Sequence, residues 1–416
     1  MTQSGDEQAI RMAERAARHS RARLVAYLAA RSGDVASAED ALAEAFAAAL
    51  TDWPRTGVPD APDAWLLTVA RRKLIDGARR RKTSADAEPH LRLLADEIVA
   101  SESSDMAIPD QRLALMFACA HPALEPSVRT ALMLQTVLGL DAATIGSAFL
   151  VPPATMSQRL VRAKTKIREA GIPFRVPEPT ELPERLDAVL QAIYAAFTRG
   201  WGDIGGEDTP QRDLVREAIF LGELLAELLP GEPEALGLAA LMLFAEARRE
   251  ARRDAAGGYV PLSEQDAGRW DVELIERAEA LLRLASRLGQ IGRFQLEAAV
   301  QSAHVARART GRTDWEAIAA LYGGLWELTR SPVVAINRAV AIGQWRGAAE
   351  GLVALAAAEV DPAIARYQPY WAAKAGLLAE AGDAAAADEA YGQAIGLATD
   401  PAAREFLIGR RQALRN

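Results

Sequence analysis

Cysteine and histidine are scarce in this chain of 416 residues. It contains one cysteine, Cys119, and its four histidines are scattered, with no pair at an HxH or HxxxH spacing. A lone thiol excludes an internal disulfide and a multi-cysteine zinc site, and isolated histidines argue against a histidine-based metal centre. We therefore expect neither a metal nor a cofactor.

Signals of enzymes, membranes and secretion are absent as well. The phosphate-cradling motifs GxxxxGKS/T and GxGxxG and the nucleophile elbow GxSxG do not occur. The longest apolar runs, such as residues 45–50, are far shorter than the ~20 residues of a membrane span. The first residues contain no apolar secretory segment. These absences predict a cytoplasmic protein that is not an enzyme and has no membrane partner.

The periodic segments that are present have the helical period, and alternating β-branched runs are missing. Helices are predicted at 8–31, 36–52, 62–82, 111–119, 125–138, 141–150 and 153–170, with about ten more to the C-terminus. Two segments have the composition of linkers: residues 83–110 are polar, and the proline-rich segment that includes residues 172–183 lacks the N–H groups that a helix needs. The pattern predicts an all-α fold with domains 8–82, 111–171 and 184–416, joined by linkers 83–110 and 172–183.

Charge is unevenly distributed along the chain. Residues 1–177 hold 23 Lys and Arg against 21 Asp and Glu, whereas residues 178–416 hold 25 against 35. The basic residues of the first part gather in the stretches 71–82 and 159–175. Counterion release depends on the phosphates that are contacted, so local patches matter more for nucleic-acid binding than average charge. Two candidate nucleic-acid-binding patches therefore lie in the N-terminal part of an otherwise acidic chain.

Residues 125–170 have the pattern of a helix-turn-helix. Gly139 can end one helix with a left-handed backbone, Asp141 can cap the next, and Pro153 suits the first turn of a third. Four apolar residues of this third helix fall on one stripe of a helical wheel: Met156, Leu160, Ala163 and Ile167. The second helix of such a motif presents its N-terminal half to a major groove.

The opposite side of this third helix carries polar and basic residues. The candidates for DNA contacts are Thr155, Ser157, Gln158, Arg159, Val161, Arg162 and Lys166. Gln and Arg side chains can read adenine and guanine edges, and Lys164 and Arg168 can neutralise phosphates. The alternative interpretation is a solvated amphipathic helix, but such a face usually mixes charges and Glu169 is the only acid in this helix.

Helix 62–82 has a second basic face. Its predicted buried stripe consists of Leu66, Leu67, Ala70 and Leu74, and the residues predicted to project outward are Thr68, Arg71, Arg72, Ile75 and Arg79. Seven basic residues and one acid lie between positions 71 and 82. Trp53, at the start of a proline-containing loop, is a candidate to stack on an unpaired base.

Helix 36–52 is acidic on its outer side. Its apolar face includes Leu42 and Phe46, and Glu39, Asp40 and Glu44 project carboxylates. An acidic amphipathic helix beside a basic one predicts a protein partner with a basic surface. The favourable interaction of acids with a helix N-terminus explains Glu39 and Asp40 equally well.

The C-terminal region contains weak repeats. Residues 339–352 are echoed by residues 375–391 at an offset of 39 residues, each with small residues and a glycine. This pattern suits tetratricopeptide-like hairpins, in which neighbouring units cover each other's apolar faces. We expect a large TPR-like helical domain that binds a protein or peptide partner, or one that only stabilises the N-terminal domains.

These segments together resemble the extracytoplasmic-function (ECF) branch of the sigma-70 family, the promoter-specificity subunits of bacterial RNA polymerase. The stretch SAEDALAEAF resembles the region 2 helix that grips polymerase, AWLLTVARRKLIDGARRR resembles the helix for the −10 element, and residues 129–170 resemble region 4, which reads the −35 element. The signature FACAHPAL…FLVPPATMSQRLVRAKTKIREAGIPFRVP and the helical tail are similar to the ECF subgroup with a TPR-like extension.

The resemblance implies a factor that binds core RNA polymerase and promoter DNA, helps to melt the DNA and performs no covalent chemistry. It implies polymerase contacts by Glu39, Asp40, Leu42, Glu44 and Phe46, −10 contacts by the outward residues of helix 62–82, and −35 contacts by those of helix 153–170. The chain departs from the family at Ala43, Arg72 and residues 197–200, where Gln, Asn and an aromatic–Asn–Glu–Gly motif are usual. The acidic tail is expected to tune activity in cis.

Two other functions fit parts of the sequence. A stand-alone helix-turn-helix regulator with a repeat-type sensor would bind duplex DNA without polymerase and would not need the acidic helix. An enzyme would use the turn QDAGRWD at residues 265–271, where Arg and carboxylate side chains cluster. Such clusters more often fix a loop than catalyse, and no nucleophile–base pair is evident in the sequence.

Overall fold

The computed structural model describes residues 10–14, 16–17, 20–80, 110–202, 210–356 and 362–414. Within these ranges the chain is helical apart from turns and loops, and its only β pairing is one isolated bridge between Arg253 and Tyr259. The predicted all-α fold is confirmed. None of the described helices is long and apolar enough to cross a membrane.

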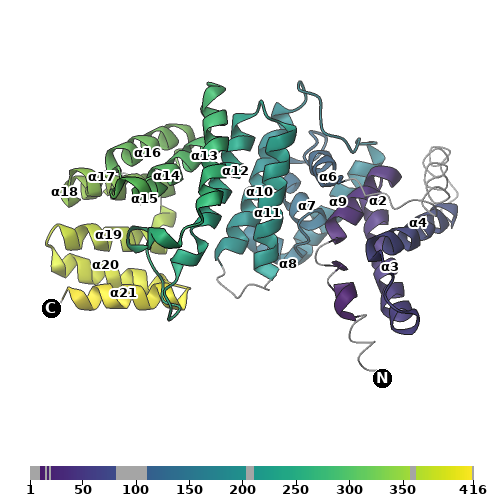
Figure 1. Cartoon of the computed structure of the whole chain (residues 1–416), viewed down its shortest axis with the longest axis horizontal. Coiled ribbons are helices and arrows are strands. Elements are labelled where there is room, and N and C mark those ends of the chain that lie inside the picture. The colour runs from purple at the N-terminus through teal and green to yellow at the C-terminus, as the bar shows by residue number, and fades with distance from the viewer. Residues whose placement is uncertain are drawn as a thin grey trace. The chain divides into compact units, whose positions relative to one another are not determined.

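The chain divides into two compact units, Met1–Leu221 and Gly222–Asn416, and the boundary falls within a helix. The helices of the first unit, coloured from purple to teal in Figure 1, are α2 (Arg21–Ser32), α3 (Val35–Thr56), α4 (Pro62–Arg80), α6 (Arg112–Cys119), α7 (Pro126–Thr136), α8 (Ala142–Ala148), α9 (Pro153–Glu169), α10 (Pro183–Gly202) and the first part of α11 (Pro210–Leu228).

Helices α2, α3 and α4 pack on one another around an apolar core. The sequence predicts a continuous helix over 8–31, but Ser20 lies in a turn just before α2. Gly33 ends α2 with a left-handed backbone (φ 67), which glycine adopts without strain, and Asp34 caps α3 by accepting a hydrogen bond from the backbone N–H of Ser37 (3.3 Å). These two adjacent residues fix the corner between the helices.

Helix α3 is longer than the sequence predicts. It continues through Pro54 to Thr56, so Trp53 is a helical residue that is only 2% exposed. Its indole lies edge-on against that of Trp65, with ring centroids 5.5 Å apart. The expectation that Trp53 stacks on an unpaired base is therefore wrong for this arrangement, because the ring is part of the core.

Helices α8 and α9 are joined by a short turn and pack on each other, at the place where the sequence predicts a helix-turn-helix. Gly139 has a left-handed backbone (φ 70), Asp141 caps α8 by accepting from Thr144 N (2.7 Å), and α9 begins at Pro153. The turn is tightly packed: a Cβ on Gly146 would lie 2.6 Å from the backbone oxygen of Val151. Glycine at this position lets the chain before α9 lie directly against α8.

The single cysteine lies in α6, all of whose side chains are buried. Cys119 is completely buried, and burial raises the pKa of its thiol to about 12. Its sulfur lies 3.7 Å from the hydroxyl of Thr136 on α7. A thiol that stays protonated has a packing role rather than a nucleophilic one.

Helix α10 packs against α6 and α7 and so lies with the N-terminal unit. The sequence places it in the C-terminal domain, after the linker 172–183. The start of α11 is tied to α6 in the same unit, because Arg112 lies between the carboxylates of Asp110 and Glu217. Burial opposes ionisation of Asp110, but the hydrogen bonds and charge of Arg112 hold its pKa below the usual value.

The second unit continues from the end of α11. Its remaining helices are α12 (Pro233–Ala247), α13 (Val272–Arg287), α14 (Arg293–Val305), α15 (Arg307–Thr310), α16 (Trp315–Thr329), α17 (Pro332–Arg346), α18 (Ala348–Leu355), α19 (Gln368–Glu380), α20 (Ala384–Leu397) and α21 (Pro401–Ala413). Short 3-10 turns η2 (Arg249–Arg252), η3 (Leu262–Glu264) and η4 (Ala267–Arg269) lie in the connection between α12 and α13.

Successive helices of this unit pack as neighbours, and α19, α20 and α21 run side by side in Figure 1. Glycines Gly347 and Gly382 form the tight turns of the α17–α18 and α19–α20 hairpins with positive φ angles (103 and 84). Gly343 and Gly351 let α17 and α18 approach closely, since a Cβ on Gly351 would lie 2.8 Å from the Cα of Gly343. The two turn glycines are closer in sequence than the 39-residue offset of the predicted repeat.

Candidate nucleic-acid interface

Four side chains determine which way α9 faces. Met156, Leu160, Ala163 and Ile167 are all buried, as the helical wheel predicts. α9 packs through this stripe against α7 and α8, and its flank also touches α3. Because the stripe is fixed in the core, the residues on the opposite side of α9 must face outward.

The outer side of α9 is polar, basic and without partners in the part of the chain that the structure describes. Ser157, Gln158, Arg159, Val161, Arg162 and Lys166 are exposed, and Thr155 is half-buried. None of the side chains of Gln158, Arg159, Arg162 and Lys166 forms a hydrogen bond or ion pair with another described residue. Exposed side chains without a partner in the protein remain available to hydrogen-bond to bases and phosphates in a groove of DNA.

Two further cations of α9 do not face outward freely. The Nζ atom of Lys164 lies 2.5 Å from a carboxylate oxygen of Glu39 in α3, and the Lys164 side chain is only 11% exposed. Arg168 lies 3.4 Å from the carboxylate of Asp34, the residue that caps α3. The sequence predicts phosphate contacts for both cations, whereas the structure pairs them with acids of the same unit.

This contact also engages part of the predicted polymerase-binding helix. Glu39 is half-buried between Lys164 and Arg21, whose guanidinium lies 3.6 Å away. Asp40 is exposed, and Glu44 is exposed with Lys73 of α4 at 2.9 Å. In this arrangement Asp40 and Glu44 are accessible to a partner, whereas Glu39 can bind one only after leaving Lys164.

The two apolar residues predicted to contact polymerase lie on the inner side of α3. Leu42 is 1% exposed and packs in the core, so the prediction that it contacts a partner is wrong for this structure. Phe46 is half-buried. An amphipathic helix buries its apolar stripe in its own domain before any partner arrives, which is why Leu42 is covered.

Helix α4 buries the predicted stripe of Leu66, Leu67, Ala70 and Leu74, together with a residue that was expected outside. Arg71 is 6% exposed and donates a hydrogen bond to the hydroxyl of Tyr27 in α2 (2.6 Å), with its guanidinium 5.2 Å from the centre of that ring. The prediction that Arg71 projects toward DNA is therefore wrong.

The sequence did carry a signal for this position. Arg71 lies four residues after Leu67 and three before Leu74, which places its Cβ on the same face as both. An arginine on an apolar stripe needs a polar partner within reach, and Tyr27 of α2 supplies it. The contact between α2 and α4 that brings Tyr27 to this place is tertiary and could not be read from α4 alone.

The remaining residues of the predicted −10 set are distributed around α4. Arg72 is exposed, and Thr68 and Ile75 are half-buried, with the Thr68 hydroxyl donating to the backbone oxygen of Ala64 (2.9 Å). The side chain of Arg79 lies outside the described residues. Among the predicted −10 contacts whose side chains the structure describes, Arg72 is the exposed cation.

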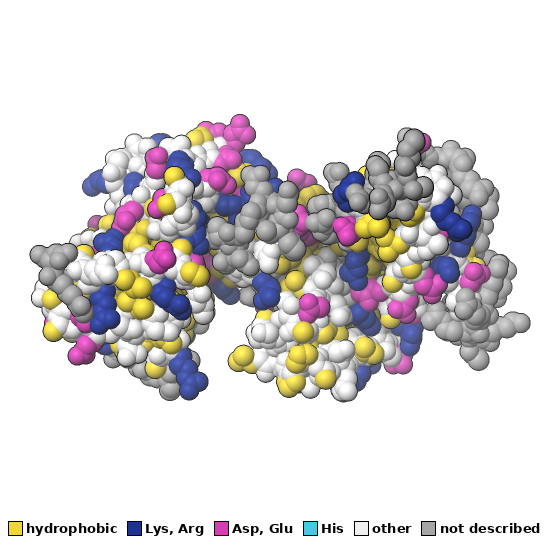
Figure 2. Space-filling model, turned by 90° about the horizontal axis from the view of Figure 1, so that it is seen from below, with side chains coloured by type: hydrophobic (Ala, Val, Ile, Leu, Met, Phe, Trp, Pro, Cys, Tyr) yellow, Lys and Arg dark blue, Asp and Glu magenta, His cyan; other side chains and the backbone are white. Residues whose placement is uncertain are grey.

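Basic residues do not collect in a single large patch on the face drawn in Figure 2, where Lys and Arg side chains are interspersed with Asp and Glu.

Comparisons with known proteins find two family matches and one similar protein. Residues 16–84, which contain α2, α3 and α4, match the family described as sigma-70 region 2. Residues 185–286 match a family of unknown function (DUF6596). An uncharacterized protein of Rhizobium meliloti (strain 1021) is 40% identical over 377 residues, which cover 89% of this chain and 88% of the relative. No solved structure matches the chain.

The described part of the chain is helical apart from turns and loops, and the outer face of α9 is polar, basic and unpaired within it. The region 2 match over α2–α4 supports a sigma-70 family factor, a class of proteins that bind RNA polymerase and promoter DNA and initiate transcription.

We expect the ion pair between Glu39 and Lys164 to contribute to the free energy of unfolding. Either single charge reversal, Glu39→Lys or Lys164→Glu, leaves two like charges facing each other at a partly buried contact. Each should lower the free energy of unfolding by about 1–3 kcal/mol, and the double swap should recover at least half of the loss. Denaturant melts of the full chain measure this coupling.

The exposed pair of Glu44 and Lys73 is the matched control, because it joins α3 to α4 with the same two residue types in solvent. The same reversals there should change stability by less than about 1 kcal/mol. Equal effects at the two pairs would show that the Glu39–Lys164 contact does not hold α9 against α3.

Proposed function

We propose that this sigma-70 factor belongs to the ECF branch and recognises its promoters with two separate helices. α9 reads the −35 element through the major groove, and α4 contacts the −10 element. The observation that carries this proposal is the outer face of α9, whose Gln158, Arg159 and Arg162 are exposed and unpaired among the described residues. Buried apolar residues every three or four positions hold this face outward.

The residues proposed to read each element follow from their exposure. On α9 they are Ser157, Gln158, Arg159, Val161, Arg162 and Lys166, with Thr155 at the edge. On α4 they are Arg72, with Thr68 and Ile75 beside it, because Arg71 is occupied by Tyr27. Gln158 and Arg162 lie four residues apart on one face and can contact neighbouring base edges.

Polymerase binding is proposed for the exposed acids of α3. Asp40 and Glu44 lie four residues apart on the solvent side of this helix, and the apolar residues beneath them belong to the core. Carboxylates at this spacing suit a basic surface on the polymerase. Glu39 joins them only when α9 leaves α3, so binding both partners at once requires the contact between Lys164 and Glu39 to open.

The polymerase contact predicts an effect of charge reversal on α3. Asp40→Lys should reduce promoter-specific transcription with core RNA polymerase by about tenfold or more, because it places a cation against a basic surface. Asp52→Lys, an exposed acid further along α3, is the matched control and should retain activity. Sequencing transcript starts in a reaction with purified core enzyme measures both the output and the promoter.

The same experiment separates the sigma factor from a stand-alone helix-turn-helix regulator with a repeat-type sensor. A regulator would bind duplex DNA in the absence of core enzyme and would not require the acids of α3. Full promoter-specific activity of Asp40→Lys would favour the regulator and contradict the proposed polymerase contact.

The DNA contact predicts a position-specific effect on α9. Arg162→Ala should weaken use of the cognate −35 sequence by about 1–3 kcal/mol, the usual value of a good base contact, and should relax preference at one base pair. Arg175→Ala, an exposed arginine beyond the end of α9, is the matched loss of charge. Transcription from a library of randomised −35 elements is the measurement. A uniform loss across all sequences would identify Arg162 as a phosphate contact instead.

We further propose that the acidic C-terminal region regulates the factor in cis and that its TPR-like helices receive a protein or peptide partner. The support is the excess of acids over bases, which is ten in residues 178–416 and three in residues 229–416, in a chain that also has two helices with basic residues on their outer faces. The tail and the DNA are both negatively charged and can compete for the same Lys and Arg side chains. The tail can therefore lower the affinity of the factor for promoter DNA.

A chain that ends at Leu228 tests this regulation. It keeps α10 and α11, and with them the contact of Arg112 with Glu217 that closes the first unit. Its transcription with core enzyme should differ at least fivefold from that of the full chain, with greater output if the tail competes with DNA. A circular dichroism melt controls for folding, and equal output from a folded truncated chain would contradict regulation in cis.

A further inference from the structure

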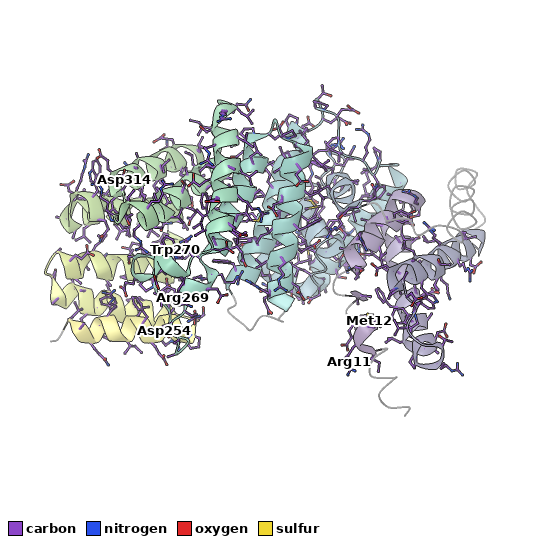
Figure 3. The ribbon with its side chains drawn as sticks, viewed as in Figure 1. Arg11, Met12, Asp254, Arg269, Trp270 and Asp314 are labelled. Atoms are coloured by element: carbon purple, nitrogen blue, oxygen red, sulfur yellow. The ribbon has the colours of Figure 1, made fainter. Side chains whose placement is uncertain are left out.

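In the connection between α12 and α13, arginine side chains donate hydrogen bonds to backbone oxygens and so hold the loop together. Arg269 donates to the carbonyl oxygens of Glu250 and Arg253, the latter at 2.9 Å. Arg307 of α15 donates to those of Ser263 (2.6 Å) and Gln265 (2.9 Å). Figure 3 labels Arg269 and Trp270 in this connection. The QDAGRWD segment is thus part of a rigid loop held against α15.

A cavity of about 160 Å³ lies beside this loop in the second unit. Its lining consists of Leu262, Ser263, His304, Arg307, Thr313 and Trp315. These residues come from η3, from the end of α14 and the start of α15, and from the turn that leads into α16 together with its first residue. The wall is therefore assembled from four segments that the loop brings together, rather than from one helix face.

One side of the cavity is apolar and aromatic. The ring of Trp315 stands edge-on to that of His304, with centroids 5.6 Å apart, and Leu262 adds an aliphatic wall. A cavity of about 150 Å³ with apolar walls is large enough to take up a benzene ring. The space at Trp315 therefore suits a body of six or seven carbon atoms.

The other side of the cavity is cationic. Arg307 lines it, and the guanidinium lies 5.1 Å from the centre of the Trp270 ring. Two of its five N–H groups are used by Ser263 and Gln265, which leaves donors for a further acceptor. The His304 ring has no hydrogen bond to another described residue, and the hydroxyl of Thr313 has none either.

No carboxylate of the described chain forms an ion pair with Arg307. Burial, with the charges of Arg248 and Arg307, lowers the pKa of His304 to about 4. Burial, with the charges of Arg252 and Arg307, lowers the pKa of Arg248 to about 10. Burial is the larger cause of both shifts and nearby positive charge adds to it, so His304 is neutral at pH 7 while Arg248 and Arg307 are positive.

The acids nearest in sequence are engaged elsewhere. Glu264 pairs with Arg410, and Asp314 caps α16 by accepting from Ala317 N (3.0 Å). Figure 3 labels Asp314 at the start of that helix. The cavity thus combines hydrogen-bond donors and uncompensated positive charge with an aromatic wall.

We propose that this cavity is a binding site for a small organic carboxylate with an aromatic or short aliphatic body. The carboxylate accepts hydrogen bonds from Arg307, Thr313 and the protonated His304, and its apolar body lies against Trp315 and Leu262. A bound anion neutralises the charge of Arg307 and favours protonation of His304, so binding takes up a proton.

Calorimetric titration of the full chain with benzoate tests this site directly. Benzoate should bind at one site per chain at pH 7, and benzamide, which has the same shape without the charge, at least tenfold more weakly. Inorganic phosphate, which has charge without an apolar body, should also bind more weakly than benzoate. Absence of saturable benzoate binding, equal binding of benzamide, or tighter binding of phosphate would each overturn the proposal.

Two variants locate the site. Arg307→Gln should weaken benzoate binding tenfold or more, whereas Arg309→Gln, which removes the same charge from an exposed position of α15, should change it less than twofold. Arg307 also holds the loop, so Thr313→Val supplies a variant that removes one hydroxyl and should weaken binding several-fold. Wild-type affinity in both Arg307→Gln and Thr313→Val would place benzoate elsewhere.

The pH dependence tests the role of His304. The charged or titratable groups that act on it are Arg248 of α12 and Arg307 of α15, and both stay positive between pH 5 and pH 7. Affinity should therefore rise as pH falls over this interval, as His304 becomes protonated in the complex, and His304→Gln should abolish that rise. An unchanged pH profile in His304→Gln would remove His304 from the site. These titrations contain no polymerase, so their failure leaves the proposed transcription function standing.

Discussion

The burial of one stripe of α9 is the constraint on which the interface depends. Met156, Leu160, Ala163 and Ile167 enter the core, and a rigid helix with one face fixed has no freedom to choose what its other face presents. The outward set of polar and basic residues is a consequence of that burial. The residues on the flank, Lys164 and Arg168, are directed to α3 by the same geometry.

The flank contact links two surfaces that have different partners in the proposed function. Glu39 belongs to the helix proposed for polymerase, and Lys164 belongs to the helix proposed for DNA. Their short, largely covered ion pair holds each charge away from its external partner. Because removing two charges from water is costly, such a pair is stable only while both members remain in place, so a partner that attracts one of them weakens the hold on the other.

The second unit uses charge differently. Its arginines Arg248, Arg269 and Arg307 donate to backbone and amide oxygens rather than to carboxylates, and so fold a loop without neutralising themselves. The unit has an acidic composition overall but a locally uncompensated positive cavity. The net charge of a unit governs its long-range attraction of charged partners, whereas recognition of a ligand depends on the side chains that line the binding site.

The all-helical fold, the buried stripe of α9, the caps at Gly139 and Asp141, and the start of α9 at Pro153 are all predictable from the amino-acid sequence. These features depend on residues within a few positions of one another, so the spacing of side chains along one helix is sufficient to predict them. Four other features became visible only in the folded chain: Arg71 turns inward to Tyr27, Trp53 lies in the core, Lys164 faces Glu39, and α10 packs with the first unit. Each of these depends on a contact between segments distant in the chain. A helical wheel shows the faces of one helix but not which other helix packs against each face.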